Sequence, residues 1–454
     1  NPAIGEQESE VILGLKSDLD ETVEIAKKAF ETWSLKPPIQ RARIMFKFKE
    51  LIEKNSDELT KMIVSEHGKV YEDAKGSLIR GLEVVEFTCG IPQVLKGEFT
   101  ENVGTDIDSW SIRQPLGVCA GITPFNFPAM VPMWMFPMAI ACGNTFVLKP
   151  SEKDPSISIK LAELFQEAGL PDGVINFIPG SGSKIGPQVM DSPNLAGIHF
   201  TGSTTVFKGM WETIGKNINK YKSYPRIVGE TGGKDFCIAH ESANIEVLTT
   251  AMIRGAFEYQ GQKCSAMSRA YIPSSIWPTL KDLLLDEVEK ITVGSPEDFT
   301  NFMNAVIDRP AYESIKEYVD ICKSSSDAEI ISGGNCDDTK GFFIEPTIVL
   351  TSNPKFRTMC EEIFGPVLTI FTYDPKDWSK TLDLIDNTSD YALPGCVISD
   401  NKDAILEAKK TLNHAAGNFY INDKPTGAVV GQQPFGGSRA SGTNDKAGSM
   451  FNLI

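Results

Sequence analysis

The sequence predicts an α/β protein whose parallel sheets are covered by helices on both faces. From Gly117 onward, short apolar runs alternate with segments of helical periodicity. Such alternation implies parallel strands joined by helical crossovers. The length of 454 residues exceeds what one hydrophobic core normally organises, so two or three domains are expected. In sheets of this kind, ligands bind at the carboxyl ends of the strands.

Helices and a hairpin are predicted before the first sheet. A helix is expected to begin at Ser17, an N-cap residue with Asp20 three positions later. Its apolar face consists of Leu19, Val23, Ala26, Phe30 and Trp33. A second, charge-rich helical stretch covers residues 39–66. Residues 97–115 alternate in polarity and contain turn residues, which predicts a hairpin standing apart from its neighbours.

Five strands and one well-marked helix are predicted for the first sheet. The strands are expected at residues 117–122, 144–149, 173–178, 196–201 and 225–229. The helix over residues 155–168 begins at a favourable proline and stops at Gly169. A second α/β pattern follows over residues 232–422, and a glycine-rich stretch covers 427–448.

The composition argues against nucleic-acid and membrane partners. The net charge is −16, from 60 acidic and 44 basic residues, which disfavours an anionic partner. Residues 116–148 carry no charge and could first be taken for a membrane span. A regular spanning helix would not tolerate the prolines that recur there every four or five residues, Pro124, Pro128, Pro132 and Pro137.

Cysteine and histidine spacing favours a reducing compartment and no bound metal. Nine cysteines are placed singly along the chain, without a CxxC pair. The four histidines are isolated and lack metal-ligand spacing. The sequence starts at Asn1 without a basic or apolar leader, so a targeting segment is expected to have been removed already.

Three motifs fall at strand ends of the predicted first sheet: TPFNFP at 123–128, LKPSE at 148–152 and FTGST at 200–204. Ser203 opens a helix, so it and the following backbone N–H groups form an anion site suited to a pyrophosphate. GSGSKIG at 180–186 has the wrong spacing for a dinucleotide fingerprint and is expected to be a loop. GETGGKD at 229–235 places Asp235 where a phosphate-binding loop has Ser or Thr, which excludes a nucleoside triphosphatase.

A candidate nucleophile lies in the segment FEYQGQKCSAMSR. Cys264 is surrounded there by small and polar residues and follows Lys263, an environment that could support a thiolate. Most cysteines are inert core residues, so the segment alone favours a structural role for Cys264 over a catalytic one. Glu230 ends a predicted strand in VGETGGK and could serve as a carboxylate base, which favours a catalytic site.

Seven motifs in order resemble the aldehyde dehydrogenase superfamily: TPFNFP, LKPSE, FTGST, GETGGK, GQKCSA, EEIFGPV at 361–367 and PFGG at 434–437. The resemblance implies the fold of that family over essentially the whole chain. Residues 1–96 and 117–230 would form a Rossmann-like NAD-binding domain and 231–427 an α/β catalytic domain. Residues 97–116 would form a β-hairpin oligomerisation arm, and 428–454 a truncated C-terminal return segment.

The resemblance also implies a role for individual residues. Cys264 would attack an aldehyde, and the Asn126 amide with the Cys264 backbone N–H would stabilise the oxyanion. Hydride would then pass to the cofactor, NAD, and Glu230 would activate the water that hydrolyses the thioester. The NAD contacts carried over are Lys149 and Glu152 at the adenosine ribose, Ser203 at the pyrophosphate, Glu362 at the nicotinamide ribose, Phe364 near the ring, and Ser151 and Gly180.

Two branches of the superfamily are resembled by different parts of the chain. Residues before about 170 look like methylmalonate-semialdehyde dehydrogenase, and residues from about 174 look like δ-1-pyrroline-5-carboxylate dehydrogenase. The second branch implies NAD-dependent oxidation of L-glutamate γ-semialdehyde to glutamate, with the substrate carboxylate held by Ser265, Gly427 and Ala428. The first implies transfer of the acyl group to coenzyme A and a carboxylate contact from Arg80.

The second branch is favoured because the first typically lacks the glutamate found at Glu230 and has arginine where Lys263 stands. A catalytically silent NAD-binding structural protein is the alternative of another class, and the intact Cys264, Glu230 and Asn126 argue against it. The resemblance further implies a homo-oligomer, weakened by a missing C-terminal strand, and a location in the mitochondrial matrix. The expected partner is a small aldehyde that carries a carboxylate.

Overall fold

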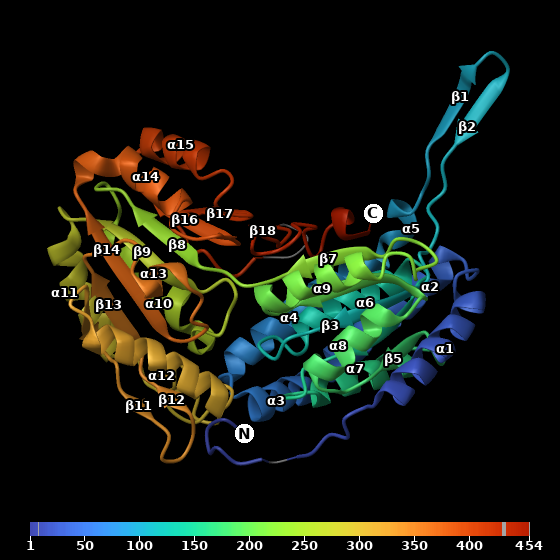
Figure 1. Cartoon of the computed structure of the whole chain (residues 1–454), viewed down its shortest axis with the longest axis horizontal. Helices are drawn as coiled ribbons and strands as arrows, with labels where there is room; N and C mark the ends of the chain where they lie inside the picture. The colour runs from blue at the N-terminus through green and yellow to red at the C-terminus, as the bar shows by residue number, and fades with distance from the viewer. Residues whose placement is uncertain (8, 429–432, 454) are drawn as a thin grey trace.

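The computed structural model describes residues 1–7, 9–428 and 433–453. Two helix-covered sheets lie side by side, and a two-stranded hairpin projects from one of them (Figure 1). The chain passes from the first sheet to the second through residues 231–234, between strands β7 and β8. The last part of the chain then returns to the first sheet.

The first sheet is parallel throughout and has the strand order β5-β4-β3-β6-β7. All five predicted strands are confirmed, with ends that differ by at most two residues. Every residue of β3, β4 and β6 is buried, which explains why these segments are continuous apolar runs. The bounds are β3 (Val118–Ile122), β4 (Thr145–Lys149), β5 (Ile175–Phe177), β6 (Leu195–Thr201) and β7 (Arg226–Glu230).

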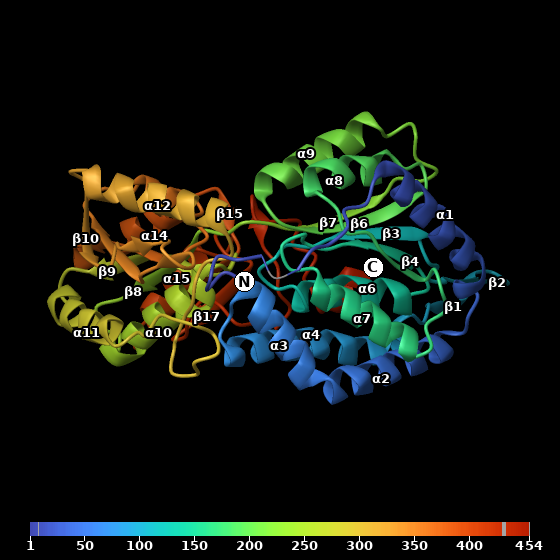
Figure 2. The ribbon, with the colours of Figure 1, turned by 90° about the horizontal axis from the view of Figure 1, so that it is seen from below.

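Helices cover both faces of this sheet, as predicted (Figure 2). One face packs on α6 (Met130–Ala141) and α7 (Ser156–Glu167), with α2 (Pro38–Lys54), α3 (Ser56–His67), α4 (Tyr71–Cys89) and the short α5 (Ile91–Val94) outside them. The other face packs on α1 (Lys16–Trp33), α8 (Gly182–Asp191) and α9 (Thr204–Lys216).

Two local predictions were wrong, one at the start of the first helix and one at residues 180–186. The first helix begins at Lys16, where the Asp18 carboxylate accepts a hydrogen bond from the Leu15 N–H at 2.7 Å, so the N-cap is not Ser17. The charge-rich stretch is helical, as predicted, and consists of two helices that meet at Asn55. The segment 180–186 is not wholly a loop, because α8 begins inside it at Gly182.

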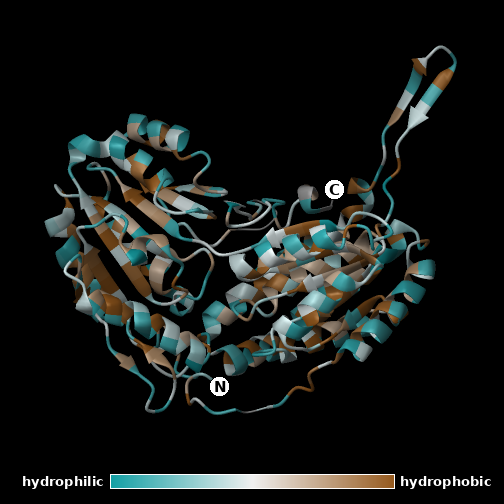
Figure 3. Cartoon of the chain, viewed as in Figure 1, coloured by the Kyte–Doolittle hydropathy of each residue, from teal (hydrophilic) through white to brown (hydrophobic). Residues whose placement is uncertain are grey.

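The predicted hairpin is confirmed as β1 (Phe99–Gly104) and β2 (Ile107–Trp110), an antiparallel pair. Figure 3 shows apolar segments along this arm, and Phe99, Ile107 and Trp110 are each more than half exposed there. The uncharged stretch at residues 116–148 forms strand β3, the buried helix α6 and strand β4. Within the described part of the chain, no helix is both long and apolar enough to cross a membrane.

The second sheet has seven strands in the order β10-β13-β14-β9-β8-β16-β17, and the β10 pairing alone is antiparallel among the pairs described. The strands are β8 (Asp235–Ala239), β9 (Met267–Pro273), β10 (Ala328–Ser332), β13 (Thr347–Thr351), β14 (Val367–Tyr373), β16 (Pro394–Ile398) and β17 (Asn418–Ile421). One face packs on α10 (Ile245–Phe257) and α11 (Trp277–Glu289). The other packs on α12 (Arg309–Ser324), α14 (Trp378–Asp386) and α15 (Lys402–Thr411).

Short elements complete the second half. They are η1 (Glu258–Gly261), β11 (Cys336–Asp337), β12 (Phe343–Ile344), α13 (Arg357–Cys360), η2 (Pro375–Asp377), β15 (Tyr391–Ala392), β18 (Ser438–Arg439) and η3 (Met450–Leu453). The C-terminal segment ties the two sheets together. Strand β18 pairs with β15, and Gly442 forms a β-bridge with Glu230 at the end of β7.

Candidate active site at the junction of the sheets

The strand register brings the three predicted motifs to one edge of the first sheet. Ile122 pairs with Lys149 on one side and with Phe200 on the other, and Thr201 pairs with Glu230. TPFNFP, LKPSE and FTGST therefore leave the sheet at neighbouring carboxyl ends, as predicted. This is the edge at which parallel sheets bind ligands.

Cys264 follows a left-handed turn in η1. Tyr259, Gln260 and Gly261 have φ values of 59°, 57° and 65°, a conformation that non-glycine residues rarely adopt. Two hydrogen bonds hold this turn: the Tyr259 hydroxyl donates to the Asp73 carbonyl at 3.1 Å, and Gln260 Nε2 donates to a carbonyl of the α3–α4 connection at 3.1 Å. The surrounding structure thus fixes the strained chain that presents Cys264.

The GETGGK loop passes directly against the nucleophile. A Cβ atom at Gly233 would lie 2.0 Å from the carbonyl oxygen of Cys264, and one at Gly232 would lie 2.4 Å from Oε2 of Glu362. Side chains cannot be accommodated at either position without a shift of these groups. The two glycines let the end of β7 approach both Cys264 and Glu362.

The thiol of Cys264 is protonated in its resting environment. It is half-buried, and burial raises its pKa well above the ordinary value; the carboxylates of Asp235, Glu362 and Glu230 raise it further. The expectation that Lys263 supports a thiolate was wrong. The Lys263 ammonium points away to Glu258, 3.2 Å from Oε2, and does not offset the carboxylates.

Glu230 is buried at the end of β7. Its Oε2 accepts a hydrogen bond from the Gly437 N–H at 3.3 Å, while Oε1 has no partner among the described residues. Burial raises the pKa of Glu230 well above its usual range, although the Gly437 N–H and the Lys446 ammonium oppose this. A carboxyl group in this state is a stronger base than an exposed glutamate.

Asn126 lies in TPFNFP and is buried. Its Nδ2 donates to the carbonyl of Gln262 at 3.0 Å, so the amide adjoins the chain two residues before Cys264. The backbone carbonyl of Asn126 accepts a hydrogen bond from the ammonium of Lys69. The structure therefore brings the predicted oxyanion donor next to the segment of the predicted nucleophile.

Glu362 lies against the GETGGK loop, and Phe364 follows it two residues later. Glu362 Oε1 accepts a hydrogen bond from the Gly233 N–H at 2.9 Å, and burial raises the pKa of Glu362 to about 7. Phe364 has a φ of 59° and packs edge-on against Phe125, with 5.7 Å between the ring centroids. This side of the site thus combines a carboxylate with an aromatic surface.

The remaining cofactor candidates gather at the ends of β4 and β6. Lys149 Nζ lies 2.6 Å from Oε2 of Glu152, and Glu152 Oε1 accepts a long 3.5 Å hydrogen bond from the Gly182 N–H at the start of α8. Burial opposes ionisation of Glu152, but the Lys149 hydrogen bond and charge outweigh it and lower the pKa. Ser203 caps α9, as predicted, by accepting a hydrogen bond from Val206 at 3.4 Å.

Ser151 and Gly180 adjoin the same group. The Ser151 hydroxyl is buried and accepts a hydrogen bond from the Lys153 N–H at 3.1 Å. A Cβ at Gly180 would lie 2.4 Å from the Ile185 side chain, so α8 can approach this turn closely. A carboxylate beside a lysine fits a ribose diol, and the N-terminus of the thirteen-residue helix α9 fits a pyrophosphate.

The substrate candidates fall into two places. The Ser265 hydroxyl lies 2.8 Å from Oγ1 of Thr426, which brings it beside Gly427, whose φ is 93°. Ala428 follows and packs against the core of the first half. Arg80 is on α4 and is paired with Glu83 at 3.0 Å, so the structure joins it to that carboxylate and not to Ser265.

Sequence reasoning missed four functional neighbours: Lys69, Asp235, Gly437 and Lys446. Lys69 contacts Asn126, Asp235 adds charge at Cys264, and Gly437 and Lys446 flank Glu230. Asp235 was considered only as a departure from the phosphate-binding-loop pattern. The PFGG motif contains Gly437, but the sequence does not indicate that the Gly437 N–H binds Glu230. Lys69 and Lys446 carry no local signal, because their partners are distant in sequence.

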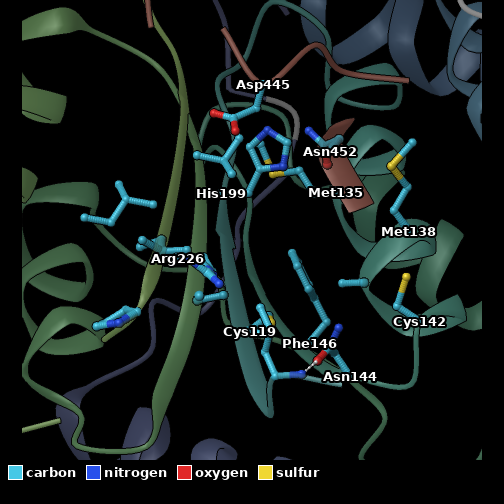
Figure 4. A pocket seen from close by; sticks show the side chains of 18 of the residues that line it. Cys119, Met135, Met138, Cys142, Asn144, Phe146, His199, Arg226, Asp445 and Asn452 are labelled. Atoms are coloured by element: carbon cyan, nitrogen blue, oxygen red, sulfur yellow. Dashed lines mark hydrogen bonds between the residues drawn. The ribbon is translucent and has the colours of Figure 1, made fainter. Parts of the chain in front are cut away.

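A separate cavity of about 820 Å³ lies between α6 and strands β3, β6 and β7 (Figure 4). Cys119, Phe146, His199 and Arg226 are among the side chains that line it. None of the predicted site residues lines it, so this cavity is apart from the group around Cys264. Across the residues that the structure describes, no group of three His, Cys, Asp or Glu side chains could hold a metal ion.

Comparison with known proteins agrees with this arrangement. The aldehyde dehydrogenase family model matches residues 1–452. The δ-1-pyrroline-5-carboxylate dehydrogenase of Danio rerio mitochondria is 42% identical over 442 residues, which cover 97% of this chain and 79% of that protein. The mitochondrial protein of the same name from Dictyostelium discoideum is 43% identical over 439 residues, 95% of this chain and 78% of that one.

Solved structures of both predicted branches are similar. Methylmalonate-semialdehyde dehydrogenase from Oceanimonas doudoroffii superposes with a TM-score of 0.92 at 35% identity, covering 100% of this chain and 91% of that chain. 1-Pyrroline-5-carboxylate dehydrogenase from Thermus with bound NAD gives a TM-score of 0.90 at 31% identity, with 97% and 84% covered. The predicted family and fold are confirmed. The chain belongs to the aldehyde dehydrogenase family.

Proposed function

We propose that this protein oxidises L-glutamate γ-semialdehyde to glutamate with NAD, through a thioester on Cys264. The observation that carries the proposal is that Cys264 and Glu362 both lie against the two glycines of the GETGGK loop, while the carboxylate of Glu230, in the same loop, acts on the charge of Cys264. Residues 1–96 and 117–230 would bind the cofactor, and residues 231–427 would carry the nucleophile. The curated relatives named for this reaction align with 95–97% of the chain, which supports the choice of substrate.

The cofactor would lie along the carboxyl edge of the first sheet. Lys149 and Glu152 would hold the adenosine ribose, with Ser151 and Gly180 beside it, and the N-terminus of α9 at Ser203 would receive the pyrophosphate. Glu362 would hold the second ribose, and Phe364 would bound the ring. When bound, NAD supplies the acceptor for the hydride.

Proton handling follows from the two raised pKa values. Cys264 rests as a thiol, so attack on the aldehyde carbon requires that its proton be removed, and Glu230, a buried carboxylate whose charge acts on Cys264, would take it. The negative charge that develops on the aldehyde oxygen would be stabilised by the Asn126 amide and the Cys264 N–H. Loss of hydride from this adduct leaves a thioester on Cys264.

Hydrolysis completes the cycle. Glu230 would accept a proton from a water molecule as the water oxygen bonds to the thioester carbon. The carbon–sulfur bond then breaks, the sulfur regains a proton, and the product leaves as a carboxylate. The Ser265 hydroxyl and the N–H groups of Gly427 and Ala428 would hold the carboxylate already present on the substrate, without a cationic side chain.

A second candidate is the coenzyme-A-dependent oxidation of methylmalonate semialdehyde. Arg80 favours it, because a cation on α4 would suit a substrate carboxylate, and the structural likeness to enzymes of that name supports it. The buried base Glu230 favours hydrolysis over acyl transfer. A homo-oligomer assembled through the exposed β1–β2 arm, located in the mitochondrial matrix, is part of the same proposal.

NADH formation with each semialdehyde, with and without coenzyme A, tests the proposal. We expect turnover of glutamate γ-semialdehyde that does not depend on coenzyme A. Turnover of methylmalonate semialdehyde alone, with a requirement for coenzyme A, would select the second candidate. NAD binding without NADH from either aldehyde would identify a silent binding protein.

A further inference from the structure

Lys69 is a fully buried lysine next to the candidate active site. It lies in the connection between α3 and α4, just after Gly68 ends α3 in the left-handed conformation, and none of its surface is exposed. Its ammonium lies 4.0 Å from the ring centroid of Phe127 and 4.3 Å from that of Tyr259. These rings flank the cation and close it off from water.

The hydrogen bond of Lys69 is made to the site itself. Within the described residues, the acceptor for its ammonium is the backbone carbonyl of Asn126. Asp73 and Asp154 contribute charge from a distance, without a hydrogen bond to the ammonium among the described contacts. Burial lowers the pKa of Lys69 well below its usual range, so the buried site disfavours the charged form, and a polar group kept there beside Asn126 calls for a specific use.

Asn126 is consequently held on two sides. Lys69 fixes its carbonyl, and its own Nδ2 donates to the Gln262 carbonyl at 3.0 Å. The Gln262 side chain is itself anchored, because Oε1 accepts a hydrogen bond from the Ile307 N–H at 3.0 Å. The orientation of the Asn126 amide thus depends on a network that begins at Lys69.

We propose that Lys69 is a positioning residue that holds the peptide of Asn126 so that the amide is aimed at the oxygen of the substrate bound to Cys264. The inference rests on the oxyanion role of Asn126 in the proposed function. Lys69 touches neither substrate nor Cys264 in this scheme. It acts through Asn126, so its contribution exists only while the Asn126 amide is present.

Lys69→Met tests this, because methionine has a similar length and no donor. We expect kcat to fall about 100-fold, the effect of a misplacement of about 1 Å, while KM changes little. Alkylation of Cys264 by iodoacetamide should proceed at the wild-type rate, because that reaction needs no oxyanion donor. When it is added to Asn126→Ala, Lys69→Met should lower kcat by less than a further threefold. If the two residues acted independently, their separate reductions in kcat would multiply.

Arg41→Met is the matched control. Arg41 is also buried and donates to a backbone carbonyl, that of Ala141 at 2.9 Å, and it is not part of the candidate site. Its loss should lower the melting temperature and leave kcat unchanged. If Lys69→Met does not fold, Lys69→Arg takes its place in the double-mutant cycle with Asn126→Ala. The bulkier arginine should displace the Asn126 carbonyl, so its effect on kcat must likewise be non-additive with that of Asn126→Ala.

Two results would overturn the inference: multiplicative effects in the cycle, or a wild-type kcat in Lys69→Met. Crystal structures of the wild type and Lys69→Met give a readout that does not need the proposed substrate. We expect the Asn126 amide to leave the Gln262 carbonyl in the variant, and an unmoved Asn126 would refute the positioning role. Absence of turnover by the wild type with every aldehyde would instead refute the proposed function.

Discussion

Replacing Gly233 by alanine tests how closely the chain must pass the nucleophile. The added Cβ would lie 2.0 Å from the Cys264 carbonyl oxygen, and real contacts of this kind are essentially never shorter than 3.0 Å, so the two chains must separate by at least 1.0 Å. The neighbour is backbone and cannot rotate away. A shift of about 1 Å at a reacting group costs on the order of 100-fold in rate, so kcat/KM should fall by about that factor.

Gly209→Ala is the control for this substitution. Gly209 lies in α9, and a Cβ added there would meet nothing within 4 Å, so alanine should raise stability by up to about 1 kcal/mol without affecting turnover. The assay is NADH formation, with circular dichroism and thermal melting to verify the fold. If Gly233→Ala kept more than a third of the wild-type kcat/KM, the close approach would not matter for chemistry and the reasoning would be refuted.

Three further outcomes are expected. Cys264→Ala should abolish NADH formation and retain NAD binding, whereas Cys360→Ala should remain active; a near-normal rate in the first variant would contradict the assignment of the nucleophile. Glu152→Gln should relax a preference for NAD over NADP of roughly ten- to a hundredfold, measured as the ratio of kcat/KM values, because the carboxylate repels a 2′-phosphate; equal use of both cofactors by the wild type would rule this out. Burial raises the pKa values of Cys264 and Glu230, so their ionised forms accumulate as pH increases and kcat/KM should rise with pH. Glu230→Gln should lose part of that dependence. A flat pH profile of the wild type would exclude Cys264 and Glu230 as the titrating groups.

Much of the first sheet could be predicted because its strands are buried on both faces. Continuous apolar runs such as Val118–Ile122 have no amphipathic alternative, and the motif after each run then falls at a known edge. Local signals were weaker at the ends of elements. Serine is a favourable N-cap residue, but the Asp18 carboxylate accepts a hydrogen bond from the Leu15 N–H, so the helix begins at Lys16 and not at Ser17.

Charge states at the site could not be predicted from neighbours in sequence. Lys263 is adjacent to Cys264, yet its ammonium is directed to Glu258, while Asp235 and Glu362 reach the thiol through the fold. Side-chain direction and long-range packing decide which charges meet. The same reason hid Lys69, whose partner Asn126 is 57 residues away.

The return of the C-terminal segment to Glu230 sets an order of events during synthesis. The N–H that Glu230 accepts belongs to Gly437, 207 residues later in the chain. At about 5–20 residues per second, a ribosome needs roughly 10 to 40 s to add that stretch. The first sheet can emerge and fold in this interval, but the partner of its carboxylate is made 207 residues later. A newly synthesised chain could therefore form the proposed sites for the adenosine ribose and the pyrophosphate, at Lys149, Glu152 and Ser203, before Glu230 gains this hydrogen bond.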